Sequence, residues 1–364
     1  MEKNEIYQIQ GQNYKEMTLE ILKASDLAGD IGDKNKYIGI KPNLVIAARA
    51  DGGAVTHPQI VDGVLTYLKE NGFNNIVVLE GSWVGDRTAE AVRVSGILDM
   101  CKKHDVRFFD MQRDSHSKKT ERGITLNICD EALKLDYLIN LPVLKGHCQT
   151  YITCALKNMK GLIPNSEKRR FHTMGLHKPI AYLNAVLHQD FILVDNICGD
   201  LDFEEGGNPV TMNRLMTFKD PVLCDSFTAQ TMGYDPYRIE YIEIAEKLGV
   251  GSTDTSKAVI HDLTPEGKKD KRMSPRGKVK TLSQYVKAED ACSACYGSLI
   301  YALDRLQDKG KLKKLEKNGI CIGQAYKGQT GKLGVGNCTR CFDKSVAGCP
   351  PKATDIIRFL EENM

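Results

Sequence analysis

The chain has 364 residues, 41% hydrophobic and 27% charged, a composition typical of a globular protein with two domains. Its formal charge of +3 does not indicate a dedicated nucleic-acid-binding protein. No apolar run approaches the roughly 18 residues of a membrane span, and the polar start lacks the apolar region of a signal peptide. We therefore expect a cytoplasmic protein with no nucleic-acid or membrane partner.

The first two-thirds of the chain alternates predicted strands with predicted helices. Such alternation predicts an α/β fold built on a large, mainly parallel sheet. In these sheets the chemistry lies in the loops at the carboxyl ends of the strands. The predicted strands occupy 37–46, 74–82, 106–110, 136–144 and 191–197, and helical spacing extends over 57–73 and 87–104.

The composition changes over residues 249–280, which are rich in Gly, Ser, Pro and Lys and are interpreted in part as a linker or solvated excursion. A helix beginning near a cysteine pair (289–312), strands at 319–323 and 332–336, and a helix at 353–363 follow. We predict a large α/β domain, residues 1–285, and a small C-terminal α/β cysteine-rich cluster-binding domain, residues 286–364.

Half of the twelve cysteines lie close together near the C-terminus, as expected for metal ligands rather than for a disulfide framework. Thiolates select zinc or iron–sulfur clusters. Two C-x-x-C pairs alone indicate a four-cysteine zinc site, although their separation exceeds that of a usual zinc ribbon. A cysteine followed by proline, as at Cys349, often closes a cluster site. The six cysteines are Cys292, Cys295, Cys321, Cys338, Cys341 and Cys349.

The arrangement C-x-x-C, Gly-x-Cys and Gly-Cys-Pro-Pro resembles the cluster-binding folds of hydrogenase small subunits and the related quinone-reductase subunit. This resemblance implies a [4Fe-4S] cluster. Cys321 is the rival for the third ligand position, and Cys341 also competes with Cys338. Zinc, and redox or structural thiols, are the alternative interpretations. The implied ligands are Cys292, Cys295, Cys338 and Cys349.

Lysines and histidines concentrate at predicted strand ends and in the loops after them. They predict a small anionic substrate, such as a carboxylate or phosphate ester, with His147 and His172 as candidate proton donors. The candidate catalytic residues are Lys145, His147, Lys157 and His172, and the candidate substrate-binding residues are Lys41, Asn43, His57, Asn158 and Lys160.

Simpler interpretations of the same residues remain open. Lys157 and Lys160 are also typical of a solvated helix face, and residues 166–172 of a mobile solvated loop. The lysines could instead be paired structurally, with Asp195, Asp220 or Asp225.

Six segments resemble the domain of unknown function 362 family, and the likeness extends from about residue 35 to the C-terminus. The resemblance implies an iron–sulfur protein, of a kind often called ferredoxin-like or oxidoreductase-like in anaerobes. We expect an oxidoreductase served by an electron donor such as a ferredoxin or flavodoxin, with a homodimer as the default assembly. The alternatives are an electron carrier, a hydro-lyase-type enzyme with the cluster as Lewis acid, and a zinc-stabilised enzyme. The segments are 41–45, 56–65, 77–82, 141–147, 155–164 and 220–227.

Overall fold

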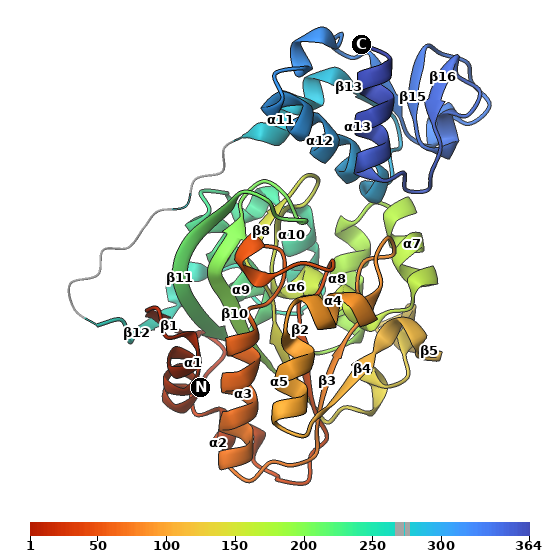
Figure 1. Ribbon diagram of the computed structural model, residues 1–364. Helices are drawn as coiled ribbons and strands as arrows, with labels where there is room; N and C mark the ends of the chain where they lie inside the picture. Colours follow the sequence, from red (N-terminus) through yellow and green to blue (C-terminus); the bar gives the residue numbers. More distant parts are fainter. Residues whose placement is uncertain (266–272, 274–276) are drawn as a thin grey trace. The chain divides into compact units, whose positions relative to one another are not determined.

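The computed structural model describes residues 1–265, 273 and 277–364 (Figure 1). The chain divides into two compact units, one comprising Met1–Arg169 and His177–Ser274 and the other Arg170–Leu176 and Pro275–Met364. Part of the linker expected at 249–280 lies outside the described residues. Within the described ranges, no helix is both long enough and apolar enough to cross a membrane.

The first unit is built on an eight-stranded sheet with the order β12-β1-β11-β10-β7-β2-β3-β4. The strands from β10 to β4 run parallel, as does the pair β1–β12, whereas β11 is antiparallel to both of its neighbours. The mainly parallel α/β prediction is therefore confirmed, and the antiparallel insertion was not predicted. The strands in sheet order are Val259–Asp262, Glu5–Gln10, Pro209–Phe218, Phe191–Asp200, Tyr137–Leu141, Ile38–Pro42, Ile76–Glu80 and Arg107–Asp110.

Helices cover the sheet, and the central strands β2, β3 and β7 are buried along their whole length. The sequences of such strands are continuous apolar runs, because both faces of each strand are covered. Figure 1 shows α1, α3 and α5 together, and their apolar residues share one core with β2 and β7. The helices are α1 Tyr14–Ala24, α2 Leu27–Ile31, α3 Pro58–Glu70, α4 Thr88–Val94, α5 Ile97–Lys103, α6 Ala155–Asn158, α8 His177–Val186, α9 Pro221–Thr231 and α10 Glu240–Lys247.

One helix prediction and one loop prediction need correction. The single helix expected over 87–104 is two helices, α4 and α5, because Gly96 between them adopts a left-handed φ of 81°. Residues 166–172 are not a solvated loop, since they lie in helix α7 (Asn165–Thr173). The small hairpins β5–β6 (His116–Glu121 and Ile124–Cys129) and β8–β9 (Lys145–His147 and Tyr151–Thr153) were not predicted.

The second unit holds a four-stranded, fully parallel sheet with the order β13-β14-β15-β16. Strands were expected at β14 and β15, whereas β13 and β16 were not foreseen, because their residues are mostly polar or exposed and lack the apolar run of β14 and β15. Helices α12 and α13 pack on each other. The elements are β13 Val286–Ala288, β14 Ile320–Ile322, β15 Leu333–Val335, β16 Lys344–Val346, α11 Lys278–Leu282, α12 Ser293–Asp308 and α13 Ala353–Glu362.

Candidate functional site

Four cysteines of the second unit follow the carboxyl ends of its parallel strands. Cys292 comes after β13 and is the N-cap of α12, and Cys295 lies in the first turn of that helix. Cys338 follows β15, and Cys349 follows β16. Because parallel strands end at the same edge of a sheet, the topology gathers these thiols at one edge.

The thiols influence one another's ionisation. The pKa of Cys295 rises to about 12 because of burial and then because of the charges of Cys292, Cys349 and Cys338. Burial also raises the pKa of Cys292, followed by the charges of Cys338 and Cys349. A cation that bound all four thiolates would remove this mutual repulsion.

Backbone contacts fix the two later cysteine loops. The amide of Asn337 donates to the carbonyl of Gly348 at 3.0 Å, and the amide of Gly348 donates to Oδ1 of Asn337 at 2.8 Å. Gly336, with φ of 92°, lies against Cys295, since a Cβ at this glycine would be 3.9 Å from the Cys295 Sγ. These contacts hold the loops of Cys338 and Cys349 close to the first turn of α12.

The two rival cysteines have different surroundings. Cys321 lies inside β14 rather than after it, and its thiol is one of the neighbours that raise the pKa of Tyr326. Cys341 is exposed. Neither contributes to the pKa shifts of Cys292 and Cys295. The structure thus groups the four implied ligands, and their role as ligands remains a prediction.

In the first unit, a buried ion pair joins the carboxyl ends of β2 and β3. The Nζ of Lys41 donates to Glu80, and the other carboxylate oxygen of Glu80 accepts the amide of Gly81 at 2.7 Å. A Cβ at Gly161 would lie 1.7 Å from Glu80 Oε1, so only glycine permits this approach. Lys41 is therefore occupied by Glu80, which the sequence analysis did not single out.

A chain of buried amides holds Lys145. Its Nζ donates to Asn43 Oδ1 at 3.0 Å and to the Ala54 carbonyl at 2.6 Å. Asn43 donates to Asn158, and Asn158 donates to Asn140, each at 2.7 Å. Burial lowers the pKa of Lys145 to about 8. Asn43 thus orients this lysine directly, and Asn158 acts through Asn43. Three of the predicted site residues therefore lie in one network.

Lys157 and His147 converge on Glu204. Lys157 Nζ lies 2.5 Å from Glu204 Oε1, and His147 Nε2 lies 3.3 Å from Glu204 Oε2. Burial acts to raise the pKa of Glu204, but Lys157 and His147 more than offset this and hold it well below its usual range. Lys157 is buried, so it is not on a solvated helix face.

The tautomer of His147 follows from its neighbours. Its Nδ1 accepts the amides of Gln149 and Thr150, both at 3.1 Å, so Nε2 carries the hydrogen that faces Glu204. Burial, and then Lys157, lower the pKa of His147 to about 4. The imidazole is neutral at neutral pH and orients Glu204 through its N–H, whereas the proton-donor role stays a prediction.

Not all of the predicted residues lie in these networks. His57 caps α3, with its Nδ1 accepting the Gln59 amide, and its ring packs on Tyr14. His172 lies in the part of α7 that groups with the second unit. Asp195 accepts the backbone amide of His57 rather than a lysine.

The other carboxylates proposed as lysine partners also have different roles. Asp220 caps α9 by accepting the amides of Val222 and Leu223. Lys41 and Lys157 are instead paired with glutamates. Glu80 had a sequence signal, because it lies near the end of the strand predicted over 74–82, whereas Glu204 lies in the loop between β10 and β11 and had none. Lys168, whose Nζ donates to the carbonyls of Gly81 and Ser82, was also missed.

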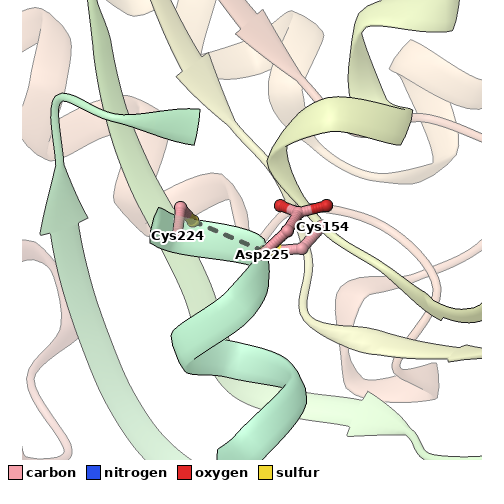
Figure 2. A group of neighbouring side chains, drawn as sticks. All are labelled: Cys154, Cys224 and Asp225. Carbon is pink, nitrogen blue, oxygen red and sulfur yellow. Dashed lines mark hydrogen bonds between the residues drawn. The ribbon is translucent and has the colours of Figure 1, made fainter. Parts of the chain in front are cut away.

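A second group of buried polar side chains consists of Cys154, Cys224 and Asp225 (Figure 2). The two sulfur atoms are 3.9 Å apart, and Asp225 accepts the hydroxyl of Tyr241 at 3.0 Å. Burial raises the pKa of Asp225 to about 7 and that of Cys224 well above its usual range. When the Asp225 carboxyl and the thiols are protonated, the group carries no charge. A neutral state avoids the high cost of burying an unpaired charge.

Asp225 makes a testable contribution to the pH dependence of stability. Its pKa is raised in the folded chain, so its stability contribution is complete below about pH 4 and is lost as pH rises through about 7. We expect the Asp225→Asn variant to lose this component, worth a few kcal/mol, and to show a flatter decline of the free energy of unfolding between pH 5 and 8. Urea unfolding followed by fluorescence of Trp83, the single tryptophan, measures it. An unchanged slope would contradict the assignment.

The chain matches the family described as domain of unknown function (DUF362) over residues 38–230, and it belongs to this family. The matched range contains the networks of Lys41, Lys145 and Lys157 and none of the four grouped cysteines. The chain is also 24% identical, over 231 residues, to a thylakoid-associated protein of Synechocystis sp., a match that covers 59% of this chain and 68% of that protein.

Two solved structures match part of the chain. The lactate racemase apoprotein from Thermoanaerobacterium thermosaccharolyticum is 12% identical with a TM-score of 0.43, and the match covers 63% of this chain and 57% of that one. A protein from Thermotoga maritima is 14% identical with a TM-score of 0.40, over 66% of this chain and 60% of that one. The chain thus spans less than two-thirds of either structure.

Proposed function

We propose that this protein is an iron–sulfur oxidoreductase that acts on a small anionic substrate. One [4Fe-4S] cluster would be held by Cys292, Cys295, Cys338 and Cys349. The substrate would bind at the lysine-rich edge of the first unit, which consists of Lys41, Lys145, Lys157, Lys160 and Lys168. One observation carries the proposal: the four thiols follow three parallel strands and meet closely enough to shift one another's ionisation. Cys321 and Cys341 are not among the main causes of these shifts.

The spacing of the thiols favours a cluster over a single zinc ion. Zinc–sulfur bonds of about 2.3 Å place tetrahedral thiolates roughly 3.8 Å apart. Among the described residues, no three of these sulfur atoms lie within 4.8 Å of one another. A cluster spreads its ligands more widely, because each thiolate binds a different iron atom.

A cluster with four thiolate ligands supplies electron transfer, and it leaves no iron free for Lewis-acid chemistry. The residues of the first unit would bind the substrate. Lysines outnumber glutamates along its edge, and burial lowers the pKa of Lys145, Lys160 and Lys168. A bound anion would allow Lys145 and Lys168 to keep their protons. A cytoplasmic ferredoxin or flavodoxin as electron donor belongs to the same proposal.

The test is analysis of iron and acid-labile sulfide in the full chain purified without oxygen, with visible spectra before and after dithionite. We expect about four irons and four sulfides per chain and a broad absorbance that bleaches on reduction. One zinc per chain and no colour would refute the cluster and make the cysteine module a structural zinc site.

A further inference from the structure

Lys160 differs from the other lysines at this edge of the first unit. In the part of the chain that the structure describes, its amine has no hydrogen-bond or ion-pair partner. It is also partly exposed, whereas the others are buried. The others are held by protein oxygens: Lys41 by Glu80, Lys145 by Asn43 and Ala54, Lys157 by Glu204 and Thr153, and Lys168 by Gly81 and Ser82.

The charges around Lys160 disfavour its protonated form. Lys157 and Lys168 are cationic neighbours, and Glu204 is the only anionic one that acts on it among the described residues. Both oxygens of Glu204 already face Lys157 and His147. Burial, and then Lys157, lower the pKa of Lys160 to about 7. A substantial fraction of this amine is therefore neutral at neutral pH.

A neutral, unpartnered amine that solvent can reach is a nucleophile, and an adjacent cation is one recognised way to activate a lysine. Lys157 is three residues earlier, so the two side chains lie on the same side of the α6 turn and its continuation. Because Glu204 pairs with Lys157 and stabilises it as a cation, the arrangement does not need a further anion to be stable. Lys160 is left available to react.

We propose that Lys160 is a nucleophilic lysine that forms an imine with the carbonyl group of a small anionic oxo compound. This inference rests on the proposed function and narrows its substrate class to oxo acids. The Lys160 nitrogen forms a bond to the carbonyl carbon, and the carbonyl oxygen takes one proton from that nitrogen and one from solvent and leaves as water. The resulting iminium carries the positive charge, and no oxidant or reductant is consumed.

The experiment traps the imine on the full chain. The protein is incubated with pyruvate, reduced with cyanoborohydride and digested, and the labelled lysine is identified by mass spectrometry. We expect one adduct per chain, at Lys160, with a labelling rate that rises to half its maximum near pH 7 rather than near the usual lysine value of 10.5. Acetone, a neutral carbonyl compound of similar size, should label it more slowly.

The matched variants are Lys160→Arg, which keeps a long basic side chain and removes the nucleophile, and Lys118→Arg at an exposed lysine of β5. Labelling should disappear in the first and persist in the second. Equal labelling of Lys160→Arg and the parent, or adducts spread evenly over exposed lysines, would overturn the proposal. If pyruvate slows the acetylation of Lys160 but no reduced adduct is found at this residue, the proposal is also overturned.

A second measurement needs no variant. Trace acetylation of the parent chain across a pH series reports the reactivity of each lysine, and Lys160 should react faster than Lys118 at pH 7. Similar rates would contradict the inference. Iron measured on the same preparation separates the two proposals: labelled Lys160 without iron refutes only the cluster, and a full cluster without labelling refutes only the imine.

Discussion

Replacing Cys349 by alanine is expected to abolish stable cluster binding, with iron falling from about four atoms per chain to a small residue. Cys349 follows β16, and its charge contributes to the pKa shifts of both Cys292 and Cys295, which places it among the grouped thiols. A cubane cluster that loses one of four thiolates exposes an iron atom to solvent, so it becomes labile. Iron and sulfide analysis with the visible spectrum measures the loss.

The matched control is Cys341→Ala, which removes an exposed thiol of the same module. This variant should keep its full iron content, because Cys341 lies outside the group. Cys321→Ala should keep it too, since that residue lies inside β14 rather than in a loop after a strand. A Cys349→Ala protein with full iron, or a Cys341→Ala protein without it, would show that the ligand assignment is wrong.

Breaking the buried ion pair between Lys41 and Glu80 is expected to destabilise the first unit by about 3–5 kcal/mol. In the Lys41→Met variant, the Glu80 carboxylate would remain buried with the amide of Gly81 as its hydrogen-bond donor. A buried charge without its counter-ion costs more than the pair contributes. Urea unfolding followed by Trp83 fluorescence reports this unit, because Trp83 lies three residues after Glu80.

Two controls separate the ion pair from general packing. Lys247→Met removes an exposed partner of Glu243 and should change the free energy of unfolding by under about 1 kcal/mol. The double variant Lys41→Met with Glu80→Gln should recover part of the lost stability, because no unpaired charge remains. If the double variant is as unstable as the sum of the two single variants, the pair has no coupling and the explanation fails.

Local sequence patterns were sufficient for most of the α/β framework. The buried runs of β2, β3 and β7 and the helical spacing of α3 are short-range signals that do not depend on distant residues. The single helix expected over 87–104 was wrong because periodicity continued across Gly96, where the backbone turns. Strands β13 and β16 lack the apolar run that indicated β14 and β15, because most of their residues are polar or exposed.

For the candidate site, the sequence by itself determined which residue types are present and that they lie near strand ends. Asn43, Lys145 and Asn158 fall in one network because parallel strands bring their carboxyl ends to a common edge. The four cysteines likewise follow strands of one sheet. Spacing along the chain carries this information, because β-strands and the loops after them are local features.

The tertiary structure alone decided which charges neutralise one another. Glu80 lies 39 residues from Lys41, and Glu204 lies 47 residues from Lys157, so no local pattern could pair them. The same pairing leaves Lys160 without a partner although it is only three residues from Lys157. The availability of this amine depends on burial and on where each carboxylate lies, and these are properties of the folded chain.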